Sequence, residues 1–320
     1  MELSIIFVNW NSVDYLRDCI ASIYANTNEI SFEVIIVDNA SPQEGVETLK
    51  SQFPDVLLIK STKNVGFAAA NNLGFQRSTG AYVLFLNPDT KLVGPTIDTM
   101  VSYLRSLPDA GIVGCKMLNA DRSVQITSIQ KFPTILNQLV NIEYLHLLWP
   151  GCPVWDIGPL FSKDLKWTRA DVIPGACMLL KRSVFEQAGM FSEEYFMYAE
   201  DLDLNYKIRR AGHKNYYVGE AAIIHYGGGS SSRQRVSHWA TIMKHRAMTR
   251  YFRKTRGRFY ETLYRTVMGC SAAGRLAILT LSSPFRGKQR DKESLQFASE
   301  KWRVVLRWAI GRQDLVLGDR

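Results

Sequence analysis

Short apolar runs alternate with amphipathic stretches along the first 120 residues of the chain. The apolar runs are rich in β-branched residues, which is typical of buried strands; they span residues 3–8, 34–37, 56–59, 82–86 and 111–114. Between the first two runs, Val13, Leu16, Ile20 and Ile23 recur at helical spacing after Ser12, a suitable N-cap. Strand and helix in alternation predict an α/β fold whose sheet is mostly parallel.

The residues that directly follow these strands are unusually rich in Asn and Asp. They form four segments, 9–11, 38–41, 64–66 and 87–90. Ligands of open α/β sheets bind beyond the carboxyl ends of the strands, where these segments meet. Turn chemistry alone favours Asn, Asp, Gly and Pro in any single segment, but four together predict a binding site at one edge of the sheet.

Several side chains in and near these segments are candidate nucleotide ligands. Asp38 ends the second strand, where its carboxylate can accept a hydrogen bond from the imide N–H of uracil or thymine. A strand-to-helix passage contains Asn64, Gly66 and Asn71, where glycine allows close approach and a helix N-terminus favours phosphate. The other candidates are Asn9, Asn11, Asn87 and Asp89. An Asx-turn explains Asp38 as well, and tight packing explains Gly66 equally well.

Asp89 and His225 are candidate metal ligands. Pro88 fixes the turn after strand 82–86, so the carboxylate of Asp89 points beyond the sheet. His225 follows the predicted strand 222–224. A carboxylate oxygen and a neutral imidazole suit Mg²⁺ or Mn²⁺, a cation that neutralises a departing diphosphate. Alternatively, Asp89 caps its own turn, and His225 is a polar residue whose hydrogen bonds are made within the fold and serve no metal.

Three carboxylates fall within four positions at the start of the predicted helix 200–210. Glu200 and Asp203 share a face at i, i+3 spacing, whereas Asp201 points elsewhere. One of them, placed at the substrate edge, can remove the proton of an acceptor hydroxyl as a general base. Acidic residues in a first helical turn also complement the helix dipole, which is the alternative explanation.

Charge divides the chain into two predicted parts. Residues 1–232 carry 19 Lys/Arg and 24 Asp/Glu, while residues 233–320 carry 20 and 6, so −5 and +14 sum to the net +9. We expect a catalytic domain at 1–232, with a nucleotide-binding half at 1–120 and an acceptor and base half at 121–232. The basic helical segment 233–320 suits an anionic membrane surface. Packing on the catalytic domain or on a partner subunit is the alternative.

The positions of the cysteines and the hydropathy of the chain indicate the cellular location of the protein. Its five cysteines are scattered without a CxxC pair, so neither a disulfide framework nor a zinc site is indicated. No apolar run reaches the roughly 18 residues of a membrane span, and the N-terminus lacks the pattern of a secretory signal. The sequence predicts a cytoplasmic protein that contacts the inner face of the cell membrane peripherally.

The ordered series of motifs resembles family 2 glycosyltransferases, most closely bacterial rhamnosyltransferase-type members, over residues 3 to 232. The motifs are Asn-Trp-Asn at 9–11, Val-Asp-Asn-Ala-Ser at 37–41, Asn-Val-Gly-Phe at 64–67, Leu-Asn-Pro-Asp-Thr at 86–90, Gly-Ala-Cys-Met at 175–178 and Tyr-Ala-Glu-Asp-Leu-Asp-Leu at 198–204. This resemblance implies a GT-A fold, a Rossmann-like sheet flanked by helices, and inversion at the anomeric carbon.

The resemblance also implies roles for individual residues. Asp38 would recognise the base, and Asp89 would be the last residue of the family's DxD metal motif, with Asn87 where the first Asp usually stands. Asp201 would be the catalytic base of the Glu-Asp pair, and His225 an additional metal ligand. The implied donor is dTDP-rhamnose, with UDP-sugars open. The implied acceptor is a hydroxyl of a glycan or lipid-linked saccharide in cell-surface polysaccharide synthesis.

Two other functions share parts of this pattern. A sugar nucleotidyltransferase also uses a nucleotide-binding α/β sheet and a metal, but the chain has no Gly-rich basic loop near its N-terminus to hold a triphosphate. A non-catalytic nucleotide or RNA-binding module is the second alternative, although Asp89, Asp201 and His225 favour activity and no nucleic-acid partner is expected. Homo-oligomer formation stays open.

Overall fold

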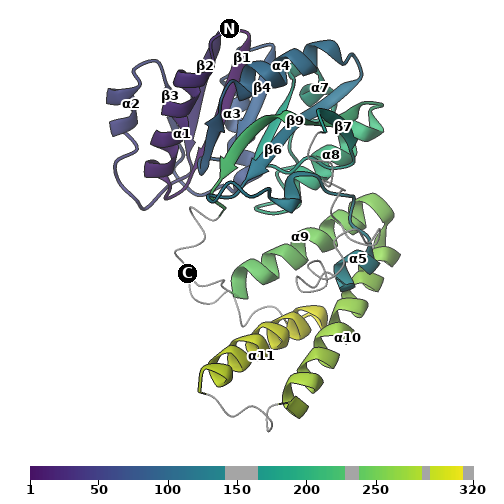
Figure 1. The fold of residues 1–320 in the computed structure, drawn as a ribbon. Coiled ribbons are helices and arrows are strands. Elements are labelled where there is room, and N and C mark those ends of the chain that lie inside the picture. Colours follow the sequence, from purple (N-terminus) through teal and green to yellow (C-terminus); the bar gives the residue numbers. More distant parts are fainter. Residues whose placement is uncertain (141–164, 228–237, 283–288, 313–320) are drawn as a thin grey trace. The chain divides into compact units, whose positions relative to one another are not determined.

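The computed structural model describes residues 1–140, 165–227, 238–282 and 289–312 (Figure 1). The chain forms two compact units: Met1–Phe132 with Trp149–Arg233, and Pro133–Leu148 with Gln234–Arg320. The second unit therefore includes a segment from the middle of the chain in addition to the basic C-terminal part. The functional division of the chain at residue 232 stays a prediction.

The first unit is built on one mixed sheet, with nine strands in its described part. The strands are β1 (Leu3–Asn9), β2 (Phe32–Asp38), β3 (Leu57–Lys60), β4 (Tyr82–Leu86), β5 (Thr90–Val93), β6 (Ala110–Leu118), β7 (Trp167–Ala170), β8 (Cys177–Lys181) and β9 (Lys214–His225). Their order is β3-β2-β1-β4-β8-β6-β9-β5, and β7 pairs with β9 outside this path.

The two halves of the sheet differ in strand direction. The strands β3, β2, β1 and β4 run parallel, because helices connect them. In the other half β8 is antiparallel to β4 and β6, and β5 and β7 are antiparallel to β9. The expected α/β class with flanking helices is confirmed, but the sheet is mixed rather than mostly parallel: its described part has four parallel strand pairs, among them β6–β9, and four antiparallel pairs.

Helices cover both faces of this sheet (Figure 1). They are α1 (Val13–Asn26), α2 (Thr48–Gln52), α3 (Phe67–Gln76), α4 (Thr96–Ser106), α7 (Arg182–Gln187) and α8 (Glu200–Arg210). In β1, Leu3, Ile5 and Phe7 pack with α1 and α4, whereas Ile6 packs with α3, α7 and α8 on the other face. Strand alternation thus divides the buried apolar side chains between two layers.

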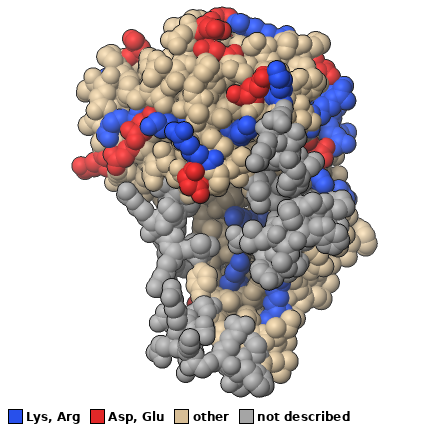
Figure 2. Space-filling model, in the orientation of Figure 1, with Lys and Arg blue, Asp and Glu red and all other residues tan. Residues whose placement is uncertain are grey.

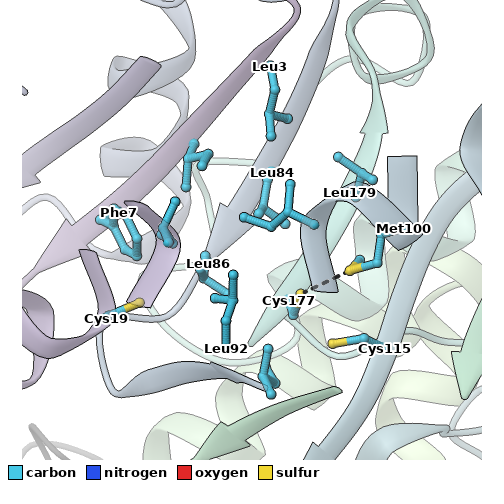
Figure 3. Packing of buried hydrophobic residues seen from close by; sticks show 14 of the residues in the cluster. Leu3, Phe7, Cys19, Leu84, Leu86, Leu92, Met100, Cys115, Cys177 and Leu179 are labelled. Atoms are coloured by element: carbon cyan, nitrogen blue, oxygen red, sulfur yellow. Dashed lines mark hydrogen bonds between the residues drawn. The ribbon is translucent and has the colours of Figure 1, made fainter. Parts of the chain in front are cut away.

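Three cysteines belong to the larger of these layers (Figure 3). Cys19, Cys115 and Cys177 are buried free thiols, and Cys177 Sγ lies 3.9 Å from Met100 Sδ. Cys270 is an exposed free thiol, and Cys152 lies outside the described residues. The buried thiols act as small apolar side chains within the core.

The second unit is helical, as expected for the C-terminal segment. Its described helices are α5 (Ile135–Val140), α9 (His238–Arg256), α10 (Arg258–Ser282) and α11 (Gln289–Ala309). A buried aromatic cluster joins α9, α10 and α11: His245 stacks on Trp308 with ring centroids 4.8 Å apart, and its Nδ1 lies 2.8 Å from the hydroxyl of Tyr264. None of the helices within the described ranges combines the length and apolar character that crossing a membrane requires.

Candidate active site

The first polar cluster lies where β1 and β2 end side by side. Asn9 and Asp38 are partners in the parallel register of these strands, and both are buried. Asn9 Nδ2 donates to Asp38 Oδ1 (2.7 Å) and to Ser41 Oγ (3.1 Å), and the Ser41 N–H donates to Asp38 Oδ2 (3.4 Å). The carboxylate of Asp38 is therefore held in a fixed orientation by hydrogen bonds from both sides.

Left-handed backbone conformations fix the loops that follow these two strands. Asn11 has a φ of 57°, and Ala40 has a φ of 56°. The Gln43 N–H donates to Asn11 Oδ1 (3.0 Å), which ties the loop after β1 to the loop after β2. Positive φ at a non-glycine residue costs about 1 to 3 kcal/mol, and such residues cluster at binding and catalytic sites.

The passage from β3 to α3 is organised by Asn39, which the sequence analysis placed in the segment 38–41 without assigning it a role. Asn39 Nδ2 donates to Asn64 Oδ1 (2.9 Å), and Asn39 Oδ1 accepts from the Val65 N–H (2.9 Å). Gly66 has a φ of 86°, and a Cβ added there would lie 2.4 Å from the Phe196 carbonyl oxygen. Close packing against the loop before α8 therefore explains this glycine without a ligand.

Two neighbouring asparagines in α3 have different partners. Asn71 Nδ2 donates within the helix to the Phe67 carbonyl oxygen (3.0 Å). Asn72 was not predicted; its Nδ2 donates to the Phe191 carbonyl oxygen (2.9 Å) and its Oδ1 accepts from the Phe191 N–H (3.1 Å). Asn72 thus connects α3 to the segment leading to α8, whereas the side-chain hydrogen bond of Asn71 stays inside the helix.

Asp89 and His225 are brought together by β5, a strand that the sequence did not predict. In the antiparallel pair β5–β9, Thr90 is opposite His225, and the Tyr226 N–H donates to the Asp89 carbonyl oxygen (3.0 Å). As a result His225 Nε2 lies 3.5 Å from Asp89 Oδ1, and it lies 3.5 Å from Asn87 Nδ2. The two candidate metal ligands therefore face one point at the end of β9.

The donor atoms at this point fit part of the ligand set of a divalent cation. Two ligand bonds of about 2.1 Å separate neighbouring ligand atoms by about 3.0 to 3.4 Å, near the observed spacing. Within the described part of the chain, no group of three or more His, Cys, Asp or Glu side chains gathers at one point. The described residues thus pair the Asp89 carboxylate with the His225 imidazole, and phosphate oxygens of a bound nucleotide would complete the ligand set.

The carboxylate of Asp201 lies at the start of α8 against the segment that precedes β8. Asp201 Oδ2 accepts from the Gly175 N–H (2.9 Å), and its Oδ1 accepts from the Leu202 N–H (2.8 Å). Burial raises the pKa of Asp201, and these hydrogen bonds partly offset the effect. Burial also raises the pKa of Glu200 to about 8, with a further contribution from the charge of Asp201.

Two consecutive residues before this pair have left-handed backbone: Tyr198 with a φ of 69° and Ala199 with a φ of 62°. Neither is glycine, so each costs about 1 to 3 kcal/mol. Glu200 Oε2 is buried and has no hydrogen-bond partner among the described residues. Strain and an unsatisfied carboxyl oxygen at one helix start are typical of functional sites rather than of ordinary helix capping.

The third carboxylate of the acidic cluster has a structural environment. Asp203 is fully buried, its Oδ2 accepts from the Ser192 hydroxyl (2.6 Å) and lies 3.6 Å from Lys207 Nζ. These contacts attach α8 to the segment after α7. Asp203 is therefore distinguished from Asp201, whose carboxylate is held by backbone N–H groups.

Backbone contacts join the metal candidates to the base candidate. The Asn87 N–H donates to the Ala176 carbonyl oxygen (3.0 Å), and the neighbouring Gly175 donates to Asp201. The segment 175–176 thus touches both the turn before Asp89 and the carboxylate at the start of α8. Gln125 is a further neighbour of His225 that the sequence did not indicate, since it lies in an irregular segment.

Residues 4–189 of the chain match the family described as Glycosyl transferase family 2. The chain belongs to this family. Among its relatives is the N-acetylglucosaminyl-diphospho-decaprenol L-rhamnosyltransferase of Mycobacterium tuberculosis, 27% identical over 90% of this chain and 96% of that protein. The rhamnosyltransferase WbbL of Escherichia coli K12 is 26% identical over 69% of this chain and 82% of that protein. The resemblance seen in the motifs is thereby confirmed.

Solved structures show the same fold at lower identity. A mannosyltransferase from Pyrobaculum calidifontis, in complex with GDP-Man and Mn²⁺, is 16% identical with a TM-score of 0.55, over 97% of this chain and 86% of that chain. GalNAc-T7 with UDP, GalNAc and Mn²⁺ is 16% identical with a TM-score of 0.56, over 70% of this chain and 44% of that chain. The GT-A fold is therefore shown, while the family match itself favours glycosyl transfer over nucleotidyl transfer.

Proposed function

We propose that this family 2 glycosyltransferase is metal-dependent and inverting, and transfers rhamnose from dTDP-rhamnose to a hydroxyl of a glycan or lipid-linked saccharide. One observation carries the proposal: the candidate base Asp201 and the candidate metal ligands Asp89 and His225 are tied together through segment 175–176. The names of the mycobacterial and Escherichia coli relatives support rhamnose and polysaccharide synthesis. A UDP-sugar is the second candidate donor.

Asp38 is the proposed reader of the nucleotide base. Its carboxylate is oriented by Asn9 and Ser41, and a carboxylate can accept the imide N–H that uracil and thymine share. Cytosine has no hydrogen on N3 and cannot make this bond. The proposed donor site also includes Asn11, which lies in the loop after β1. Its remaining members lie at the passage from β3 to α3; they are Asn64, Gly66 and Asn71.

The proposed reaction is a single in-line displacement. Asp201 accepts the proton of the acceptor hydroxyl, the oxygen forms a bond to the anomeric carbon, and the bond from that carbon to the diphosphate breaks. A bound Mg²⁺ or Mn²⁺ supplies the positive charge that neutralises the leaving diphosphate. Asp89 and His225 would hold this cation, and Asn87 Nδ2 lies 3.5 Å from His225 Nε2. The raised pKa of Asp201 suits a general base because it increases its affinity for the transferred proton.

Calorimetric titration with nucleoside diphosphates tests this function. We expect dTDP and UDP to bind more tightly with Mn²⁺ than without it, and CDP to bind more weakly than both. With dTDP-rhamnose and Mn²⁺, slow release of dTDP should be detected. Equal binding of dTDP and CDP with no effect of Mn²⁺ would rule out the proposed donor site, and is the result expected of an RNA-binding module.

The outward face of α10 supports a proposed location on an anionic membrane surface. Phe259 is 80% exposed and Leu281 is 74% exposed, and no exposed residue from 259 to 281 is charged. The charged residues of this stretch have partners within the second unit: Arg265 donates to the Trp308 carbonyl oxygen (3.0 Å), Arg275 lies over the Trp302 ring (4.5 Å), and Glu261 pairs with Arg253 (3.7 Å). Such a helix suits the interface of a membrane better than an aqueous surface.

Basic side chains accompany this apolar face. The last turn of α9 carries Arg253, Lys254 and Arg256, and all three are exposed beside the start of α10. In Figure 2 the first unit shows both signs of charge, whereas the described surface of the second unit shows Lys and Arg among uncharged residues. Attraction to anionic headgroups and burial of the α10 face would together hold the enzyme beside a lipid-linked acceptor.

Vesicle sedimentation tests this location. We expect binding to phosphatidylserine-containing vesicles, little binding to neutral phosphatidylcholine vesicles, and partial retention at high salt because apolar burial is not screened. Phe259→Asp with Leu281→Asp should lower the bound fraction several-fold. Leu57→Asp, a matched change at a partly exposed position of β3, is the control. Equal binding of both variants would contradict the role of the α10 face.

A further inference from the structure

Gln125 contacts His225 from the side opposite β5. Gln125 Nε2 donates to the His225 carbonyl oxygen (2.6 Å), and Gln125 Oε1 lies 3.2 Å from His225 Nδ1. One side-chain amide thus binds both the backbone and the ring of the same histidine. On the other side of the ring, Nε2 faces Asp89 Oδ1 at 3.5 Å.

The backbone of Gln125 is fixed to the sheet. The Gln125 N–H donates to the Met117 carbonyl oxygen (2.8 Å), and the Gln125 carbonyl oxygen accepts from the Ser128 hydroxyl (2.7 Å). Met117 lies in β6, which is paired with β9 at Met117–Ile223. Gln125 is therefore positioned by the same strand pairing that positions His225, and its amide has little freedom to leave the ring.

This geometry selects one tautomer of a neutral His225. A carbonyl oxygen only accepts hydrogen bonds, so the amide nitrogen of Gln125 must face it and Oε1 must face the ring. Two acceptors cannot bond to each other, so Nδ1 carries the hydrogen and donates to Oε1. Nε2 then keeps its lone pair, and it lies 3.5 Å both from the amide nitrogen of Asn87 and from Asp89 Oδ1, the other candidate metal ligand.

We propose that Gln125 is a positioning residue that holds His225 as the Nδ1–H tautomer, so that the Nε2 lone pair is directed to a divalent cation shared with Asp89. The inference rests on the proposed metal site and adds the residue that prepares one of its ligands before the cation binds. Histidines that bind metals commonly donate their other ring N–H in this way, which fixes the tautomer and the orientation of the ring.

The tautomer can be measured in the metal-free protein by two-bond ¹H–¹⁵N correlation spectra of a sample labelled with ¹⁵N-histidine. The chain has five histidines, and the signals of His225 are identified by their loss in His225→Gln. We expect the Nδ1–H pattern in the wild type at pH 8. In Gln125→Met, which has similar length but no hydrogen bond to the ring, the Nε2–H form should become predominant.

Two further variants keep the test decisive. Gln130→Met is the matched control, because Gln130 donates to the Thr127 carbonyl oxygen instead (3.4 Å), and it should leave the His225 signals unchanged. Gln125→Glu retains an acceptor for Nδ1–H and should retain the Nδ1–H tautomer, even if Gln125→Met does not fold. An Nε2–H or doubly protonated His225 in the wild type would overturn the inference, as would an unchanged tautomer in folded Gln125→Met.

Metal binding gives a second readout. In the presence of dTDP, Gln125→Met should bind Mn²⁺ about 10- to 100-fold more weakly than the wild type, the usual effect of losing such a partner. If the wild type itself shows no Mn²⁺ binding with dTDP, the proposed metal site is wrong. The tautomer comparison still decides whether Gln125 sets the state of His225, so the two failures are distinguishable.

Discussion

Replacing Asp201 by Asn is expected to lower the turnover of sugar transfer about 10²- to 10⁴-fold, the usual contribution of a general base. The amide is nearly isosteric and its oxygen can still accept from the Gly175 N–H, but it cannot take the acceptor proton. Initial rates with dTDP-rhamnose and a saccharide acceptor would measure the effect. The loss should appear in kcat, while the affinity for dTDP measured by calorimetry stays near that of the wild type.

The pH profile provides an independent signature of the same base. Burial raises the pKa of Asp201, so the carboxylate takes up a proton at a higher pH than an exposed Asp. The protonated form cannot act as a base, so wild-type turnover should fall as the pH is lowered through this raised pKa. The residual activity of Asp201→Asn should lack this decline, because the titrating group has been removed.

Asp203→Asn is the matched control for Asp201→Asn. It makes the same chemical change two residues away, where the carboxylate accepts from Ser192 and lies near Lys207. Weakening a buried ion pair should lower the free energy of unfolding, while kcat of the folded protein should fall far less than in Asp201→Asn. Near wild-type transfer by Asp201→Asn would show that the base has been assigned wrongly.

The polar edge of the sheet could be predicted because strand ends and turn residues follow from local sequence. Strands β1, β2, β3, β4 and β6 and helix α1 lie where the apolar pattern predicted them, and α8 lies at the predicted helix 200–210. Asn9 and Asp38 end neighbouring parallel strands, so their contact follows from the order of the strands. The connections between strands and helices in this half are short and regular, so the local sequence pattern is sufficient to predict where these elements lie.

The residues that organise this edge depend on long-range pairing instead. The four-residue strand β5 is too short to give a period, yet its antiparallel pairing with β9 brings Asp89 to His225. From the sequence, Asn39 is expected to be a turn residue and Asn72 an ordinary helix residue. Their roles could not be predicted because their hydrogen-bond partners lie in distant segments. The strand β9 extends back to Lys214, well before the apolar run 222–224, since pairing with β6 and β7 maintains it.

Asp89→Asn is expected to remove most of the increase in dTDP affinity that Mn²⁺ produces, and to lower transfer by about 10²-fold or more. Loss of several kcal/mol of electrostatic stabilisation accounts for this size, because about 1.4 kcal/mol corresponds to a factor of ten. The backbone of Asp89 still accepts from the Tyr226 N–H, so the β5–β9 pairing and the fold should be retained. Titration of Mn²⁺ in the presence of dTDP measures the effect.

The double change Asp89→Asn with His225→Gln separates a shared metal site from two independent roles. If both side chains hold one cation, the second change should add little to the first, because the site is already lost. Additive losses would instead show that His225 acts elsewhere. Asp55→Asn, an exposed carboxylate before β3, controls for the loss of one negative charge and should leave the Mn²⁺ titration unchanged. Since no third His, Cys, Asp or Glu of the described residues joins Asp89 and His225 here, the wild type should bind Mn²⁺ weakly until the nucleotide diphosphate is present.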